Sequence, residues 1–288
     1  MKPLTELQMQ KADIERLGDI AAEAYEIAGR LCGSCRNLHA LWPYIRLSRS
    51  STGLEPSGSV LEMALRLFIR EGLRKILVAG AADTGLLSLV LRAADDFSVD
   101  VTVLDVCDAP LELCRRWASR RSIRLETVKQ DLADLGELQT FDLVLVHGTL
   151  HFITAEERLN VLARIHSALR PRGRLILLFN TSKSSMIGKN DKFHVEYAQS
   201  VVKELRRLAI SLPDTESEFV RRLSDHSRQR QEREGAFANS DDARRLLEAA
   251  EFSISACREV EIPRSAQTFT SHISKHRFMA IAEPKVSA

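Results

Sequence analysis

The sequence lacks several features that would assign it to a class at once. It has no run of roughly 20 apolar residues, the length that a membrane-spanning helix needs. Its first residues lack the apolar core of a signal peptide. An excess of one charge is also missing, since 41 Lys and Arg are balanced by 39 Asp and Glu, so the composition demands no polyanionic partner. We therefore expect a cytoplasmic protein with no membrane partner and no need of nucleic acid.

Cysteine is scarce and scattered along the chain. The five thiols are odd in number and do not resemble the dense, even set of a disulfide framework. Two of them form a C-x-x-C motif with His39 nearby, but the sequence shows no fourth ligand for a structural zinc site. We interpret the pair as reduced thiols on successive turns of a helix, and we expect no metal. The cysteines are Cys32, Cys35, Cys107, Cys114 and Cys257.

The first 70 residues predict helices. Apolar residues recur at helical spacing over 14–31, a loop rich in Ser, Gly and Pro is expected over 48–59, and another helix over 60–69. We expect residues 1–70 to form a helical cap or lid, and residues 71–288 to form the main domain.

From residue 75 onward, short apolar runs alternate with amphipathic stretches. Repeated strand–helix units with short connections predict an α/β fold with a largely parallel sheet covered on both faces. Residues 181–239 interrupt the alternation and predict a helical insertion after the fifth strand. A helix capped by Ser240 then restores it. Strands are expected at 76–80, 101–104, 124–128, 141–146, 174–179, 252–260 and 277–282, and further helices at 86–94, 110–119, 155–169, 195–210 and 216–233.

A glycine-bounded loop follows the first expected strand. Its sequence is Gly80-Ala-Ala-Asp-Thr-Gly85, and its small residues let a ligand approach the backbone and the next helix N-terminus. Asp105 ends the second strand, 20 residues after Gly85. A carboxylate there can accept hydrogen bonds from both ribose hydroxyls of an adenosine cofactor, and it would repel a 2′-phosphate. The alternative is a helix N-cap, a role that Asp108 could fill instead.

Asp131 and Leu132 follow the third expected strand. Asp131 could accept a hydrogen bond from an adenine amino group while Leu132 packs against the ring. The alternative is that Asp131 caps the turn over 132–135. The residues alone leave the two interpretations open.

Taken together, the sequence resembles the class I S-adenosylmethionine-dependent methyltransferase superfamily. The match runs over about 75–178, and its most telling parts are a Phe-Asp-hydrophobic strand followed by a His-rich loop, and a Leu-x-Pro-x-Gly-x-Leu turn. The last two expected strands resemble the closing hairpin of that fold. Five stretches match in order: Ile76-Leu-Val-Ala-Gly-Ala-Ala-Asp-Thr-Gly85, Val103-Leu-Asp-Val106, Gln130-Asp-Leu132, Phe141-Asp-Leu-Val-Leu-Val-His-Gly-Thr-Leu-His-Phe152 and Leu169-Arg-Pro-Arg-Gly-Arg-Leu-Ile-Leu177.

The resemblance implies a fold, a cofactor and cofactor contacts. The fold is a Rossmann-like seven-stranded, mostly parallel sheet with an antiparallel last strand, plus N-terminal helices and a helical insertion after strand five. The cofactor is S-adenosyl-L-methionine. The loop after the first strand would contact its methionine part, Asp105 its ribose, and the remaining residues its adenine or the pocket floor. The implied contacts are Gly80, Ala81, Ala82, Gly85, Asp105, Val106, Asp131, Leu132, His147 and Gly148.

The first motif departs from the family pattern. Family members often begin it with Asp or Glu, whereas Val78 stands at that position, and the glycine stretch is one residue longer through Asp83. Hydrogen bonds to the methionine amine and carboxylate therefore cannot be carried over directly. Asp83 could compensate, or it could serve only as a helix cap.

Methyl transfer mainly requires alignment of the acceptor and exclusion of water, with a general base for acceptors that must lose a proton. Our hypothesis is that His151 is the base and His147 shapes the pocket; the alternative is that both are hydrogen-bonded structural residues. Trp42 and Tyr44 either bind substrate from a lid or pack against the core. Further expected substrate contacts, at the carboxyl end of the fifth strand, are Asn180, Lys183 and His194.

Three other functions compete with methylation of a small molecule at oxygen or nitrogen. A nucleic-acid methyltransferase would need a basic track, but acidic residues interrupt the positive segments 203–207 and 221–233. The Asp/Asn-Pro-Pro-aromatic sequence of base-methylating enzymes is absent after the fourth strand. A cofactor-binding regulator without turnover is a second rival, and a nicotinamide dehydrogenase is a third. A homodimer through the N-terminal helices is possible.

Overall fold

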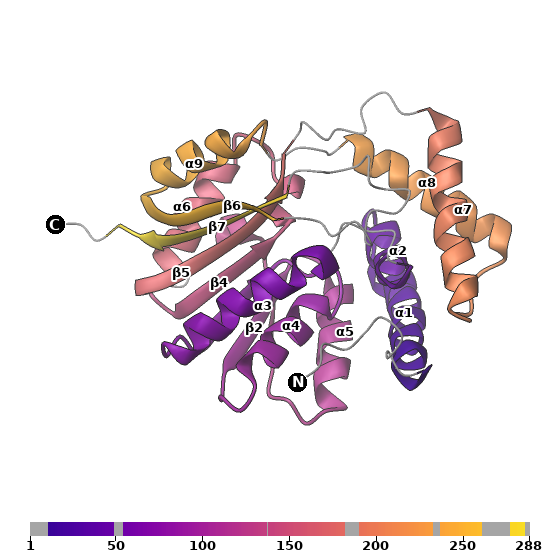
Figure 1. Ribbon diagram of the computed structural model, residues 1–288, viewed down its shortest axis with the longest axis horizontal. Helices are drawn as coiled ribbons and strands as arrows, with labels where there is room; N and C mark the ends of the chain where they lie inside the picture. Colours follow the sequence, from indigo (N-terminus) through magenta and orange to yellow (C-terminus); the bar gives the residue numbers. More distant parts are fainter. Residues whose placement is uncertain are drawn as a thin grey trace.

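The computed structural model describes residues 11–48, 54–136, 138–181, 190–232, 237–260 and 277–285. Within these ranges no helix is both long enough and apolar enough to cross a membrane. A central sheet lies between two layers of helices, and a separate group of helices packs at one side (Figure 1).

One seven-stranded sheet organises the fold, in the order β3-β2-β1-β4-β5-β7-β6. The first five strands are parallel, and β7 runs antiparallel to both β5 and β6. This confirms the predicted mostly parallel sheet with an antiparallel last strand. Strand order reverses between β1 and β4, where open α/β sheets bind ligands at their carboxyl ends. The strands are β1 (Lys75–Ala79), β2 (Asp100–Asp105), β3 (Glu126–Lys129), β4 (Phe141–His147), β5 (Leu169–Asn180), β6 (Phe252–Val260) and β7 (Arg277–Pro284).

Two helical layers bury the faces of the sheet (Figure 1). Successive strand side chains point to opposite faces. In β1, Ile76 and Val78 therefore join one apolar cluster while Leu77 and Ala79 join another. The first cluster is covered by α3 (Leu54–Arg70), α4 (Gly85–Ala94) and α5 (Asp108–Ser119), and the second by α6 (Arg158–Ala168) and α9 (Ser240–Ala249).

A third apolar cluster forms where the N-terminal helices meet the insertion. Its four helices lie together at one side of the sheet (Figure 1), and we call them the helical cap. Because α3 packs on the sheet instead, only part of the expected 1–70 cap takes this position. The cap helices are α1 (Lys11–Leu31), α2 (Arg36–Leu47), α7 (Asp191–Arg207) and α8 (Glu216–Glu232).

Three local predictions were wrong. The expected loop over 48–59 is shorter because α3 already begins at Leu54. The third residue of this helix is a proline, which is tolerated because an N–H in the first turn of a helix has no acceptor within the helix. Ser240 is the first helical residue rather than the cap, since the side chain of Asn239 accepts the Asp242 N–H at 2.9 Å. Cys32 and Cys35 lie in the turn between α1 and α2, not on successive turns of one helix.

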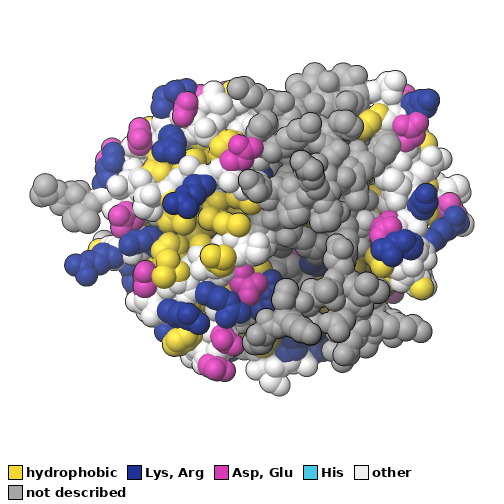
Figure 2. Space-filling view, viewed as in Figure 1, with side chains coloured by type: hydrophobic (Ala, Val, Ile, Leu, Met, Phe, Trp, Pro, Cys, Tyr) yellow, Lys and Arg dark blue, Asp and Glu magenta, His cyan; other side chains and the backbone are white. Residues whose placement is uncertain are grey.

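Charges of both signs are interspersed over the surface. Figure 2 shows Lys and Arg side chains close to Asp and Glu side chains on the described part of one face, with no area of a single sign. Many are paired along a helix, as in the pair of Arg207 with Glu204 in α7. The positive segments of the cap helices are thus largely neutralised locally.

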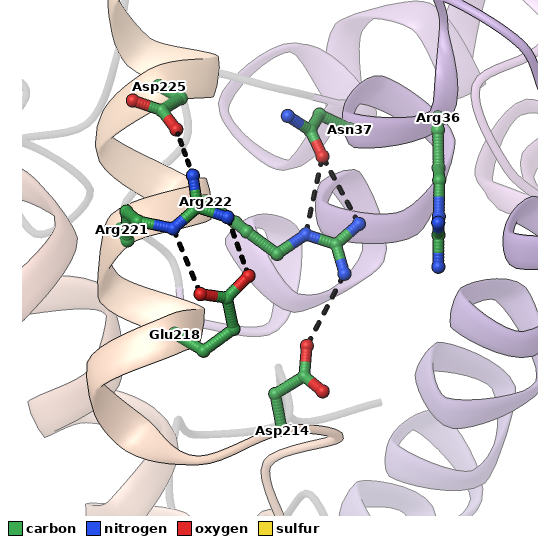
Figure 3. A pocket seen from close by; sticks show the side chains of 7 residues that line it. All are labelled: Arg36, Asn37, Asp214, Glu218, Arg221, Arg222 and Asp225. Atoms are coloured by element: carbon green, nitrogen blue, oxygen red, sulfur yellow. Dashed lines mark hydrogen bonds and ion pairs between the residues drawn. The ribbon is translucent and has the colours of Figure 1, made fainter.

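A polar hollow of about 390 Å³ lies where α2 meets α8. Arg222 points across it from α8 toward Asn37 on α2, and its guanidinium also bonds Asp214 (Figure 3). The Tyr25 hydroxyl completes these contacts from α1. Arg222 is only 9% exposed, so this one side chain joins three parts of the cap. The hollow is lined by Arg36, Asn37, Asp214, Glu218, Arg221, Arg222 and Asp225.

We expect Arg222→Ala to destabilise the protein by about 2–3 kcal/mol, because it removes the donor to the buried Tyr25 hydroxyl on α1 and to half-buried Asn37 on α2. The neighbouring Arg221 is the matched control. It lies on the same helix but is exposed, and among the described residues it pairs with Glu218 and Asp225 of its own helix, so Arg221→Ala should leave the unfolding midpoint unchanged. Urea unfolding followed by circular dichroism measures both. Equal midpoints for the two variants would contradict the assigned role of Arg222.

Candidate functional site

The loop after β1 requires glycine at its first position. Gly80 has φ +84, and a Cβ there would lie 2.3 Å from Thr149 Oγ1. That hydroxyl donates to the Ala79 carbonyl at 2.8 Å, while the Gly80 N–H donates to the Leu104 carbonyl at 2.8 Å. The loop is therefore fixed between β2 and the segment after β4. Thr149 was not among the residues predicted for the site.

Asp83 fills the position expected for either a compensating acid or a cap. Its carboxylate is buried, accepts the Gly85 N–H at 2.7 Å and pairs with Arg46 of α2 at 2.8 Å. The hydrogen bond from the Gly85 N–H directly supports the interpretation of Asp83 as a helix cap. Arg46 was not among the residues predicted for the site, and it brings a guanidinium from the helical cap to the loop after β1.

Asp105 links the loops that follow β1 and β2. Its Oδ2 accepts the Ala81 N–H at 2.9 Å and its Oδ1 accepts the Cys107 N–H at 2.8 Å. Burial raises the pKa of this carboxyl, and the backbone donors act in the opposite direction. Each oxygen retains a second lone pair for a ligand hydroxyl. Next to it Val106 is 59% exposed, an apolar surface on which a flat ring could pack.

Asp131 and Leu132 lie at the end of the neighbouring strand. Asp131 Oδ1 accepts the Ala133 N–H at 2.9 Å and so caps the short 3-10 turn Leu132–Asp134. Leu132 is buried beneath this turn. The capping contact is present, and contact with an adenine ring remains a prediction.

His147 ends β4 and is followed by Gly148, whose φ is +70. Its Nε2 is buried and has no hydrogen-bond partner among the described residues. Burial, together with the charge of Arg277 and the proximity of His151, lowers the pKa of His147 to about 3. The imidazole is therefore neutral at physiological pH and is a weak base.

This environment predicts an acid-sensitive stability. A histidine whose pKa falls from 6.5 to about 3 on folding is neutral when folded but binds a proton when unfolded, so stability is lost as pH falls below 6.5. Between pH 6.5 and 4.5 the loss should be about 2 kcal/mol for one group. We expect His147→Asn to remove that part of the pH dependence. Parallel pH–unfolding curves for wild type and variant would contradict the low pKa.

His151 lies in the 3-10 turn Thr149–Phe152 after β4. Its Nε2 accepts the Asn180 N–H at 3.3 Å, and a neutral imidazole that accepts at Nε2 carries its proton on Nδ1. Its lone pair is therefore already used by the backbone. Service as a general base would require this hydrogen bond to break.

A buried arginine completes the carboxyl edge of the sheet. Arg277, the first residue of β7, is 4% exposed and its Nε donates to Asn180 Oδ1 at 3.1 Å. The sequence presents it only as the start of a strand. A charged residue opening an otherwise apolar strand was the signal available.

The structure separates the residues expected to bind substrate. Tyr44 is fully buried, with ring centroids 6.4 Å from Tyr25 and 5.2 Å from Phe219, which favours the packing alternative. His194 is 1% exposed, with Nδ1 2.9 Å from Ser227 Oγ between α7 and α8. Both lie inside the helical cap, and we do not place them in the substrate site.

The remaining expected substrate contacts have different positions. Asn180 lies at the carboxyl edge, beside His151 and Arg277. Trp42 is half-buried on α2. Lys183 falls outside the described residues.

Comparison with known proteins gives one family match. Residues 76–173 match the model of a family described as a methyltransferase domain. No curated protein sequence matches the chain. The matched segment begins in β1 and ends within β5, at Gly173.

Solved structures share the fold at low sequence identity. A 1,6-didemethyltoxoflavin-N1-methyltransferase of Burkholderia thailandensis, solved with 1,6-didemethyltoxoflavin and S-adenosylhomocysteine, is 18% identical, with TM-score 0.53, covering 99% of this chain and 93% of its own. The N-methyltransferase NodS of Bradyrhizobium japonicum is 13% identical, with TM-score 0.51 and coverages of 82% and 99%. The PH0226 protein of Pyrococcus horikoshii is 18% identical, with TM-score 0.51 and coverages of 82% and 92%.

Proposed function

We propose that the chain is a class I S-adenosylmethionine-dependent methyltransferase that methylates a small molecule at oxygen or nitrogen. The match of residues 76–173 to a methyltransferase domain and the order of the strands support this proposal. The observation that carries this proposal is the Asp105 carboxylate, held at the carboxyl end of β2 beside the loop that follows β1 and beside exposed Val106. An acidic side chain with free lone pairs, an apolar surface and a close-approach loop are the contacts that an adenosyl cofactor needs.

Methyl transfer from this cofactor requires little chemical assistance from the protein itself. When bound, S-adenosylmethionine supplies an activated methyl group on a sulfonium, so the protein mainly aligns the acceptor and excludes water. A neutral His147 places no positive charge at the end of β4, where an imidazolium would repel a cationic ligand. Asn180 and Arg277 provide polar groups at the same edge for orienting an acceptor.

Several observations support a small acceptor. The toxoflavin and NodS enzymes share the fold, and the first was solved with 1,6-didemethyltoxoflavin bound. On the described part of the face seen in Figure 2, the mixed charge offers no basic track for phosphates. We keep Trp42 and Lys183 as proposed substrate contacts, a homodimer as a proposed assembly and the cytoplasm as the proposed location.

Transfer of labelled methyl groups tests the acceptor class. Purified protein is incubated with methyl-labelled S-adenosylmethionine and cell extract, and label is measured in low-mass, protein and nucleic-acid fractions. We expect enzyme-dependent label in the low-mass fraction, and none with Asp105→Ala. Label in nucleic acid would overturn the small-molecule proposal. Cofactor binding without label in any fraction would favour the regulator instead.

The histidines are tested by turnover once an acceptor is known. Because the Nε2 lone pair of His151 is used by Asn180, we expect His151→Ala and His147→Ala to lower kcat by less than about tenfold each. Removal of a true general base typically costs about 10²–10⁴-fold. A loss of that size in His151→Ala, together with loss of the acidic limb of the pH–rate profile, would restore His151 as the base.

A further inference from the structure

Three cysteines and a histidine from separate segments of the chain meet beside the loop Gly80–Gly85 that follows β1. One ligand atom from each of Cys32, Cys35, His39 and Cys107 lies within 4.8 Å of all the others. The Sγ of Cys107 is 3.4 Å from that of Cys32 and 3.5 Å from that of Cys35. These sulfurs are too far apart for a disulfide, whose S–S bond is about 2.05 Å, and all three cysteines are free.

The separations suit a tetrahedral metal. A centre with Zn–S of about 2.3 Å and Zn–N of about 2.0–2.1 Å places neighbouring ligand atoms roughly 3.5–3.8 Å apart. Cys32 and Cys35 have the C-x2-C spacing that is typical of structural zinc sites, and His39 follows in the next helix. Cys107 is the fourth ligand that the sequence did not show, because it lies 72 residues beyond Cys35.

The ligands are already oriented by surrounding contacts. His39 Nδ1 lies 3.3 Å from the Ala82 carbonyl, and a carbonyl only accepts, so Nδ1 holds the proton and Nε2 is the nitrogen able to bind a metal. The Cys107 N–H donates to Asp105 Oδ1 at 2.8 Å, which fixes the start of α5. His39 and Cys107 are buried, and Cys32 and Cys35 are half-buried.

We propose that Cys32, Cys35, His39 and Cys107 bind one structural Zn²⁺. Four protein ligands leave no open position for substrate, which distinguishes a structural centre from a catalytic one. Three thiolates and an imidazole select a borderline-soft cation over Mg²⁺ or Ca²⁺. This inference does not depend on methyl transfer.

The position of the site defines what the metal does. Cys32 and Cys35 belong to the turn between α1 and α2, whereas Cys107 follows β2. His39 also contacts Ala82 in the loop that follows β1, and Cys107 contacts Asp105 at the end of β2. The metal therefore fastens the α1–α2 hairpin of the helical cap to the loops of the Rossmann-like domain.

The first test measures the metal content of the full-length protein, purified anaerobically from zinc-supplemented cells. We expect about one zinc per chain in wild type and in Cys257→Ser, a control whose thiol lies outside the cluster. Cys107→Ser and Cys32→Ser should each retain less than about a tenth of the zinc content of wild type. Full zinc retention in Cys107→Ser, or a Cys32–Cys35 disulfide found by mass spectrometry in the anaerobic protein, would overturn the proposal.

A second measurement needs no cysteine variant and so remains decisive where a variant fails to fold. Wild-type protein stripped of metal is titrated with Co²⁺ in the absence of oxygen. We expect a one-to-one titration that yields visible absorption of tetrahedral Co²⁺ and thiolate charge-transfer bands. Zn²⁺ should displace this spectrum and raise the unfolding midpoint by about 5 °C or more. No tetrahedral spectrum, or no stabilisation by Zn²⁺, would overturn the proposal.

Discussion

Asp105→Ala should raise the dissociation constant for S-adenosylhomocysteine at least about 100-fold, equivalent to about 2.8 kcal/mol. The carboxylate is expected to accept both ribose hydroxyls, and charge-assisted hydrogen bonds of this kind are each worth about 1.5–3 kcal/mol. The substitution also removes the acceptor of the Ala81 and Cys107 N–H groups, so the loops after β1 and β2, which we propose frame the cofactor, lose their common anchor. Isothermal titration calorimetry measures the change directly.

Asp100→Ala is the matched control for this experiment. Asp100 occupies the opposite end of the same strand, is exposed, and uses its backbone rather than its side chain to reach Arg74. The affinity of the Asp100→Ala variant for S-adenosylhomocysteine should equal that of wild type. Circular dichroism of Asp105→Ala separates lost binding from lost folding. Wild-type affinity in a folded Asp105→Ala protein would place the cofactor elsewhere.

Gly80→Ala should cost about 3 kcal/mol or more of stability, together with most of the cofactor affinity. Two penalties combine, because the residue has φ +84 and its new Cβ would lie 2.3 Å from Thr149 Oγ1 and 2.8 Å from its Cγ2. The backbone term is about 1–2 kcal/mol, and overpacking typically adds about 1–3 kcal/mol. Urea unfolding gives the stability, and calorimetry with S-adenosylhomocysteine gives the affinity.

Gly72→Ala isolates the backbone penalty. Gly72 has φ +103 but no heavy atom within 4 Å of a built Cβ, so it should lose only the 1–2 kcal/mol of the left-handed conformation. Adding Thr149→Ala to Gly80→Ala should recover part of the loss, since the two closest atoms are removed. Equal costs at both glycines, with no recovery in the double variant, would show that the contact with Thr149 is not limiting.

The sheet could be predicted because its strands carry a local signal. Buried parallel strands are nearly continuous apolar runs, as in Leu77–Ala79 of β1 with Gly80 at its end, and each is followed by a helix of different periodicity. The position of Asp105 could be predicted for a similar reason, since its place at the carboxyl end of β2 follows from counting along the chain. The capping contact of Asp131 was also open to sequence reasoning, because it involves only nearby residues.

What could not be predicted depends on contacts between distant segments. Cys107 follows β2 and carries no local sign that it meets the α1–α2 turn. Arg277 lies beside Asn180 only because β7 pairs antiparallel with β5. Tyr44 and His194 are of residue types that often bind ligands. They are buried because α2 and α7 pack into one apolar cluster. Periodicity identifies a buried face but not its partner.

Thermal unfolding of the wild-type protein with S-adenosylmethionine, S-adenosylhomocysteine, NAD or no ligand tests the cofactor assignment most directly. A ligand that binds only the folded state stabilises it by mass action, by about 2.7 kcal/mol at a concentration 100 times its dissociation constant. We expect both adenosyl compounds to raise the unfolding midpoint and NAD to leave it unchanged. An unchanged midpoint with both adenosyl compounds at millimolar concentration, or an equal rise with NAD, would contradict a methyltransferase site built on Asp105 and the Gly80 loop.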